Sequence, residues 1–176
     1  MNTDSTVRQQ VWDRFNALHG GIGNFERNIR ELGLMDRQSV LDVLGALVAQ
    51  DPNPEIRGNA STCLLKLAGP SALQLVLPLL DHPDQSLRWH VCGLLHDFGD
   101  KTVVPYLTNV LLEDPEPGVR IVAAWALEKH GNLSALPALQ HAAENDKGAD
   151  WEGRTVADAA RKAIERITTP PKPRWS

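Results

Sequence analysis

Apolar residues recur at helical spacing along most of the chain, and one arrangement of them returns several times. It is clearest between Asp114 and Gly131, where a turn with two prolines precedes a run of core positions at helical intervals: Val119, Ala123, Ala126, Leu127 and His130. This spacing predicts an amphipathic helix that begins after the turn and ends at Gly131. The segments 51–69 and 81–99 carry the same arrangement. The chain is therefore predicted to be a helical repeat protein.

The length of the repeat follows from an arginine that comes directly after an aliphatic residue in each copy. Arg57, Arg88 and Arg120 are 31 and 32 residues apart, which suits a pair of helices joined by short turns. A degenerate fourth copy follows, in which Ala157 replaces the arginine and the preceding segment, 145–155, is longer. We expect about four such helical hairpins.

The predicted fold is an all-α solenoid with an N-terminal helical cap at residues 1–35, a repeat array at 36–167 and a flexible, proline-rich tail at 168–176. Asp36 is expected to cap the first helix of the array. The helices that follow are expected at 54–68, 71–80, 84–98, 101–112, 116–130, 133–143 and about 152–167. Three prolines fall inside the expected outer helices and should kink them: Pro78, Pro105 and Pro137.

Three segments, DPNPEIRGNASTCLLKLAG, DHPDQSLRWHVCGLLHDFG and DPEPGVRIVAAWALEKHG, resemble HEAT repeats of the short type first associated with phycobilisome lyases. The resemblance covers roughly residues 36–167. The third segment matches almost throughout, the second has Val91 and Cys92 in place of an alanine pair, and the fourth copy lacks the arginine and the terminal glycine. The resemblance implies a solenoid but little about function, because such repeats serve as scaffolds, lyases, toxin-neutralising proteins and DNA glycosylases.

Composition narrows the classes of partner. The formal net charge of −4 argues against a general nucleic-acid binder, since such proteins neutralise phosphates with a basic surface. The N-terminus has no apolar signal region, and no stretch was expected to reach the roughly 20 apolar residues of a membrane span. These features favour a cytoplasmic protein with no membrane partner. Cys63 and Cys92 lie at core positions and are expected to be buried, reduced thiols.

Charged residues recur with the repeat. Each copy has a turn aspartate and a helix arginine, and the expected pairs are Asp51 with Arg57, Asp81 with Arg88, and Asp114 with Arg120. A catalytic charge ladder is one interpretation. The other, which we favour, is structural, because a motif repeated at every turn performs the same task each time: it ties the turn to the next helix by charge-assisted hydrogen bonds.

The sequence offers no catalytic or metal-binding motif. The chain has six histidines, and no two of them are four residues apart on one helix, as a HExxH-like metal pair requires. His130 falls on the core stripe and is expected to be a hydrogen-bonded core histidine. No glycine-rich phosphate loop, nucleophile elbow or CxxC motif occurs. We therefore expect no cofactor, no metal and no local catalytic site, although a carboxylate site assembled from different repeats would leave no local motif.

Some large apolar residues lie on a helix face that is not predicted to point into the core. At about 100° per residue, Ile121 and Trp125 point away from the core positions of their helix. Trp89 and Gly93 are their equivalents one repeat earlier, and Gly58 is the equivalent of Trp89 one repeat before that. The HEAT resemblance implies that this side lines a concave groove. The expected groove residues are Trp89, His90, Ile121, Val122, Trp125, Gly58 and Gly93. Alternatively, the tryptophans pack sideways between neighbouring helices.

Three functions remain open. The leading hypothesis is a non-enzymatic module that presents a concave, partly apolar groove to a protein partner, as a scaffold, an adaptor or a toxin-neutralising protein. The second is a bilin lyase-like or other ligand-handling protein, which the repeat type permits. The third is a DNA glycosylase-like binder, which the negative charge disfavours.

Overall fold

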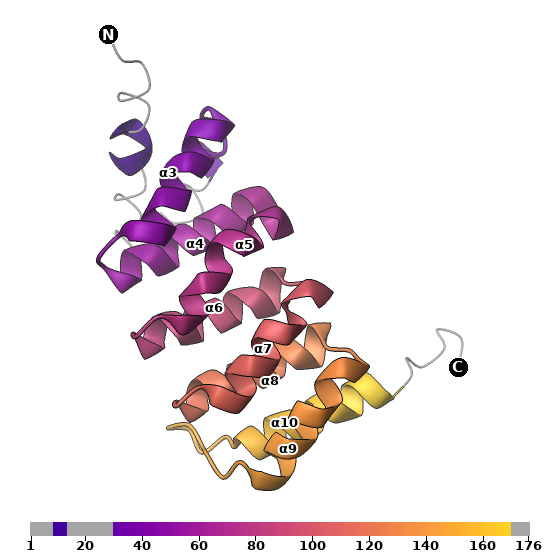
Figure 1. Ribbon diagram of the computed structural model, residues 1–176. Coiled ribbons are helices and arrows are strands. Elements are labelled where there is room, and N and C mark those ends of the chain that lie inside the picture. Colours follow the sequence, from indigo (N-terminus) through magenta and orange to yellow (C-terminus); the bar gives the residue numbers. More distant parts are fainter. Residues whose placement is uncertain (1–8, 14–29, 170–176) are drawn as a thin grey trace. The chain divides into compact units, whose positions relative to one another are not determined.

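The structure is a computed structural model that describes residues 9–13 and 30–169, and most of these residues are helical (Figure 1). The chain forms two compact units, residues 1–78 and 79–176, which are described one at a time below. Apart from helices and loops, the described residues contain an isolated β-bridge between Ala149 and Thr155. The all-α prediction is confirmed. The predicted cap and tail lie largely outside the described residues.

The first unit is built on a helical hairpin. α3 (Arg37–Gln50) begins at Asp36, as predicted, because the Asp36 carboxylate accepts a hydrogen bond from the Ser39 backbone N–H at 2.9 Å. α4 (Pro54–Ala68) begins at Asn53, whose side chain caps it in the same way. The two helices pack against each other through a shared set of fully buried side chains that includes Val40, Leu44, Val48, Ala60, Cys63 and Leu64.

The run Pro54–Asp81 is long and apolar enough to cross a membrane by length and composition, so the expectation that no such stretch exists was wrong. The structure nevertheless divides this run. α4 is followed by the 3-10 helix η2 (Gly69–Ala72), the short α5 (Leu73–Val76) and the 3-10 helix η3 (Leu77–Asp81). Half of the most apolar window is buried inside the protein. The apolar composition is thus shared by several short packed segments.

The second unit has two layers of helices (Figure 1). One layer contains α6 (Gln85–Phe98), α8 (Pro117–His130) and α10 (Val156–Thr168), and the other contains α7 (Val104–Glu113) and α9 (Leu136–Asn145). α8 packs against α6, α7 and α10, while α9 packs against α7 and α10. α8 therefore has neighbours on three sides, and seven of its residues are buried. This arrangement is the predicted solenoid of helical hairpins.

The prolines expected inside the outer helices occupy other positions. α7 and α9 are each preceded by a 3-10 turn, η4 (Lys101–Val103) and η5 (Leu133–Ala135), and Pro105 and Pro137 stand in the first turn of the α-helix that follows. Proline is tolerated there because the first backbone N–H groups of a helix have no partner within the helix. Pro78 lies in η3. The outer helices are therefore divided at a 3-10 turn and do not contain an internal, kinking proline.

Two glycines end α6 and α8 for a steric reason. At Gly99 and Gly131 the backbone is extended, with φ of −67° and −60°, which other residues also adopt. A Cβ at either position, however, would lie 2.2 Å from a carbonyl oxygen one turn earlier, that of Leu95 or Leu127. Each glycine N–H donates to that same carbonyl, at 2.9 and 2.8 Å. The repeat therefore ends in glycine because the chain passes too close to the helix for a side chain.

Candidate binding groove

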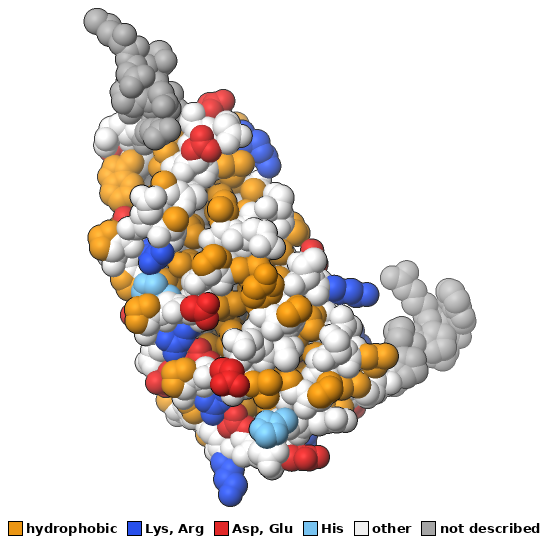
Figure 2. Space-filling view, in the orientation of Figure 1, with side chains coloured by type: hydrophobic (Ala, Val, Ile, Leu, Met, Phe, Trp, Pro, Cys, Tyr) orange, Lys and Arg blue, Asp and Glu red, His pale blue; other side chains and the backbone are white. Residues whose placement is uncertain are grey.

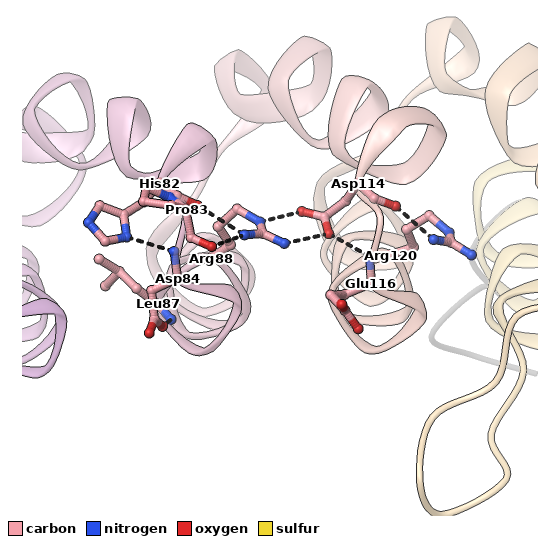
Figure 3. A network of polar contacts seen from close by, with 8 residues as sticks. All are labelled: His82, Pro83, Asp84, Leu87, Arg88, Asp114, Glu116 and Arg120. Carbon is pink, nitrogen blue, oxygen red and sulfur yellow. Dashed lines mark hydrogen bonds and ion pairs between the residues drawn. The ribbon is translucent and has the colours of Figure 1, made fainter.

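A buried arginine joins consecutive turns of the second unit (Figure 3). Arg88 of α6 donates through Nε and Nη2 to both carboxylate oxygens of Asp114, at 2.7 and 3.0 Å. Its Nη1 donates to the carbonyl oxygens of His82 and Pro83, in the turn that precedes α6. As whole residues, Arg88 and Asp114 are 7% and 9% exposed. The hydrogen bonds to Asp114 raise the pKa of the Arg88 guanidinium above its ordinary value. The bidentate pair fixes two turns to each other.

The same arrangement returns one repeat later. Arg120 of α8 donates to both carboxylate oxygens of Asp146, at 2.7 and 3.0 Å, and to the carbonyl oxygen of Asp114 at 2.7 Å. Asp114 and Asp146 also shape their own turns, because each accepts a backbone N–H two residues further on, from Glu116 and Gly148. Each arginine thus binds its own turn through backbone carbonyls and the next turn through a carboxylate.

The predicted pairing within each repeat was therefore wrong. Arg88 binds the aspartate of the following repeat and not Asp81, whose side chain is exposed, and Arg120 contacts only the backbone of Asp114. In the first unit, Arg57 donates to the carbonyl oxygens of Val48 and Ala49, and the Asp51 carboxylate accepts the Asn53 N–H. Sequence reasoning also missed Asp146, although it directly follows Asn145 at the start of the long fourth turn.

The Asp146 carboxylate gives the second unit a predicted acid sensitivity. Burial raises the pKa of Asp146, but hydrogen bonds from Arg120 and from the Gly148 N–H outweigh this effect and hold the pKa below its ordinary value of 3.8. A depressed folded-state pKa contributes stability that is present above the unfolded-state pKa and is lost as the pH falls through the folded-state value. Asp146→Asn should therefore weaken the dependence of the unfolding free energy on pH between about pH 5 and pH 2.

Chemical denaturation at several pH values, compared with the exposed-site variant Glu113→Gln, measures this slope. The role assigned to Asp146 is contradicted if both variants lose stability with acid as steeply as the original protein.

The opposite ends of α6 and α8 are also joined. His130 Nε2 donates to the carbonyl oxygen of His96 at 2.7 Å, and Lys129 Nζ donates to that of Asp97 at 3.4 Å. These bonds supply partners to carbonyl groups in the last turn of α6, which have none within the helix. The prediction that His130 is a hydrogen-bonded core histidine agrees with this contact, although the side chain is only half-buried. α6 and α8 are thus held together at both ends.

Between the Arg88–Asp114 pair at one end of α6 and the His130–His96 contact at the other lies a hollow of about 600 Å³. We call this hollow the tryptophan groove. Trp89 and Gly93 of α6 are four residues apart, and Val122 and Trp125 of α8 are three apart, so each pair shares one helix face. Trp89 is 50% exposed, and the space beside Gly93 is open, since a Cβ there would meet no atom within 4 Å. The groove therefore has two indole rings with free space next to them.

The other end of the groove is charged. Its lining there comes from His96, Asp97, Glu128, Lys129, Lys162 and Arg166. Lys162 of α10 pairs with Glu128 of α8 at 3.3 Å, and His96 Nδ1 lies 2.9 Å from the Asp97 carboxylate. These residues were not predicted, because their contribution depends on how α10 packs beside α8. The groove thus combines an apolar part with a part of mixed charge, and both kinds of surface occur in protein-binding sites.

Four of the seven predicted groove residues line the groove, namely Trp89, Gly93, Val122 and Trp125. The prediction was wrong for Ile121, which is 1% exposed and belongs to the core. A helix with neighbours on three sides buries more than one stripe. His90 is half-buried and lies outside the groove lining. Gly58 is buried in α4 of the first unit and does not line this groove.

Trp125 has one partner that the sequence did not indicate. The guanidinium carbon of Arg154 lies 5.1 Å from the centre of the Trp125 ring, within the range of a cation–π contact. Arg154 comes from the segment that precedes α10, so this contact too depends on the fold. The side chain of Trp125 is half-buried. The alternative interpretation was that the tryptophans pack sideways between neighbouring helices. The half-buried Trp125 fits this interpretation in part, whereas the 50% exposed Trp89 does not.

The two cysteines are buried free thiols, as predicted. Burial raises the pKa of Cys63 and of Cys92 to about 12, so both remain protonated near neutral pH. Neither is suited to nucleophilic chemistry. Within the described part of the chain, no three His, Cys, Asp or Glu side chains are grouped as a metal site.

Exposed apolar side chains also occur on the opposite layer. Over α7 and α9, hydrophobic side chains are interspersed with charged ones (Figure 2). Tyr106 and Leu112 of α7 are each 43% exposed, and Leu133 of η5 is 71% exposed. Scattered residues of this kind are normal on a protein surface. The tryptophan groove differs because its aromatic residues border an open hollow.

Comparison with known proteins agrees with this architecture. A family model described as HEAT repeats matches residues 26–82 and 75–165, which together make up most of the chain. An epoxyqueuosine reductase from Listeria monocytogenes is 39% identical over 54 residues, which are 31% of this chain and 14% of the reductase. The chain therefore matches only a small part of that relative's length. The helical hairpins, their recurring turns and the match over most of the sequence show that the chain belongs to the HEAT-repeat family.

Proposed function

We propose that this helical repeat scaffold is a non-enzymatic binding module that takes an apolar side chain of a protein partner into the tryptophan groove. The observation that carries the proposal is the open space beside Gly93, in a hollow that the half-exposed Trp89 and the more buried Trp125 also line. Tryptophan is enriched among the residues that dominate binding energy at protein interfaces. A glycine inside a helix is unfavourable by up to about 1 kcal/mol relative to alanine, so its presence calls for a reason.

The surroundings of the groove favour binding without large rearrangement. The Arg88–Asp114 pair joins the beginning of α6 to the turn before α8, and the His130–His96 contact joins the ends of the two helices. The distance between the helices is thus set at both ends before any partner arrives. Preorganisation of this kind reduces the entropy lost on binding.

The groove also suggests the chemistry of the partner. An apolar side chain that enters beside Gly93 would lie next to Trp89, Val122 and Trp125, which line the same hollow. Polar groups of the partner then meet the charged end, where Lys162 and Glu128 form an exposed ion pair. We infer that apolar contact supplies most of the affinity and that the charged end contributes specificity.

Filling the space should abolish binding without loss of stability. Gly93→Leu places a side chain where a partner would insert, and Gly93→Ala is the matched control, because one methyl group leaves most of the hollow open. Both variants should unfold at the same or a higher temperature than the original protein, since both residues are better helix formers than glycine. Affinity capture from the source lysate, followed by mass spectrometry, should recover the same partner with Gly93→Ala and lose it with Gly93→Leu.

The proposal is contradicted if the original protein, Gly93→Ala and Gly93→Leu all capture the same proteins. It is also contradicted if Gly93→Ala loses the partner to the same extent as Gly93→Leu. A purified protein with visible absorbance would instead support the bilin-handling alternative. The match to the Listeria reductase gives no support for that activity in this chain, because the 54 matched residues are fewer than two repeats at the 31–32-residue period. The net charge of −4 continues to disfavour nucleic acid as the partner.

A further inference from the structure

A second hollow, of about 650 Å³, adjoins the tryptophan groove at the beginnings of α6 and α8. Trp89 borders both hollows, and the far wall of the second one is the segment 149–154. We call the lining of this second hollow the tryptophan ledge. Its larger apolar side chains include Trp89, Pro117 and Trp151. Trp151 is 89% exposed, more than any other large apolar side chain in the described ranges. An exposed aromatic surface of this kind commonly marks a binding site.

The turn that carries Trp151 is closed by several hydrogen bonds. Asp150 Oδ1 accepts the backbone N–H groups of Glu152 and Arg154, each at 3.0 Å, and Asp150 Oδ2 accepts Arg154 Nε at 2.6 Å. Gly153 donates its N–H to the Asp150 carbonyl, and its φ of +80° is a left-handed conformation that glycine adopts without strain. The turn therefore presents a tryptophan to solvent on a backbone that is already ordered.

The ledge carries negative charge. Its charged residues are Glu116, Asp150, Glu152 and Arg154, so three carboxylates and one guanidinium give a formal charge of −2. Arg154 pairs with Asp150 at 2.6 Å and with Glu152 at 2.7 Å, so these three residues together keep one net negative charge, and Glu116 adds a second. An approaching lysine or arginine is therefore attracted to the ledge, and an approaching carboxylate is repelled.

We propose that the tryptophan ledge binds an extended, proline-rich segment of another protein that carries a lysine or an arginine. Such a segment adopts the polyproline II conformation, whose rings pack on aromatic side chains and whose carbonyl groups are free to accept hydrogen bonds from exposed indole N–H groups. The basic side chain lies beside Glu116 and Glu152, close to the Trp151 ring. This inference rests on the proposed function and names the class of segment that the scaffold takes next to the tryptophan groove.

Two other modes of peptide recognition fit the ledge less well. Addition of a strand needs an open sheet edge, whereas the described residues contain only the isolated bridge between Ala149 and Thr155. A bound helix needs a long apolar groove, and the ledge is short and bordered by carboxylates. A polyproline segment requires only aromatic faces and a nearby acid.

The test uses the full chain and a fluorescein-labelled peptide of three prolines followed by Lys-Pro-Arg, with fluorescence anisotropy as the readout. Trp151→Ala should weaken binding by about tenfold or more, because a central aromatic contact is removed. Its melting temperature should match that of the original protein, since the side chain is 89% exposed. A peptide with glutamate in place of both basic residues, and one with alanine in place of proline, should bind weakly. Gly93→Leu should bind the basic peptide as well as the original protein does.

The inference is overturned if Trp151→Ala binds the basic peptide as tightly as the original protein does. It is also overturned if the original protein binds the alanine or the glutamate peptide as tightly as the basic peptide. Binding of the original protein to neutral phosphatidylcholine vesicles that disappears in Trp151→Ala, with no binding of the peptide, also overturns it and indicates a lipid surface. The proposed function fails separately, in the capture experiment with Gly93→Leu, so the two failures are distinguishable. Peptide binding that requires Trp151, proline and a basic residue, and that survives in Gly93→Leu, supports the inference.

Discussion

Replacement of Arg88 with alanine should lower the free energy of unfolding by about 3–5 kcal/mol. Both members of the Arg88–Asp114 pair are buried, so the substitution leaves the Asp114 carboxylate without its guanidinium in a site with little access to water. It also leaves the carbonyl oxygens of His82 and Pro83 without their donor. The loss therefore combines an unpaired buried charge with two unsatisfied acceptors. Chemical denaturation followed by circular dichroism measures it.

Arg120→Ala is the matched control for this prediction. It removes an equivalent bidentate carboxylate pair and one carbonyl contact, where Arg88→Ala removes two. The side chains of Arg120 and Asp146 are 14% and 15% exposed, compared with 9% and 4% for the side chains of Arg88 and Asp114. Water can partly replace the lost contacts there, and we expect a smaller loss of about 1–3 kcal/mol. If the Arg88 variant keeps its stability but loses the partner captured by the original protein, the arginines are functional and their structural assignment is wrong.

Ile121→Ala should lower the free energy of unfolding by about 2–5 kcal/mol, although Ile121 was predicted from sequence to line the groove. The side chain is 1% exposed in a helix that contacts α6, α7 and α10. Truncation removes buried methyl groups and leaves a cavity that closely packed neighbours cannot fill. Ile121→Val, which removes a single methylene group, should lose only about 0.5–1.5 kcal/mol. Chemical denaturation of both variants gives the comparison.

Partner capture adds a second measurement for Ile121. Below its melting temperature, the valine variant should capture the same partner as the original protein, because its side chain does not reach the groove. Loss of the partner from a stable Ile121→Val protein contradicts the assignment to the core and restores the prediction made from sequence.

Local patterns in the sequence were sufficient to predict most helices. α4 was expected at 54–68 and is found at Pro54–Ala68, because Asn53, Pro54 and the glycine at 69 mark its ends locally. α10 was expected to begin at about residue 152 and begins at Val156. The intervening residues form the turn that Asp150 and Arg154 close through side-chain contacts. Such contacts leave no periodic pattern, so the helix start could not be read from hydrophobic spacing.

The groove was predicted only in part, for a related reason. Helical spacing correctly placed Trp89 and Gly93 on one face, since positions four apart always share a face. The same spacing cannot show how many neighbours a helix has. Ile121 lies opposite the core stripe, a position that helical spacing alone predicts to be exposed, and the packing of α8 between α6 and α10 buries it. The partners of Arg88 and Arg120, each 26 residues away, likewise depend on the stacking of repeats.

The direction of the arginine contacts has a consequence for biosynthesis. Arg88 and Arg120 each bind a carboxylate that lies 26 residues further along the chain, so neither has its full set of partners until the next turn has been synthesised. In the second unit, each new turn therefore completes the contacts of the helix made before it. α10 has Ala157 in place of the arginine, so this dependence ends there and the last hairpin of the described array leaves no buried cation in need of a partner.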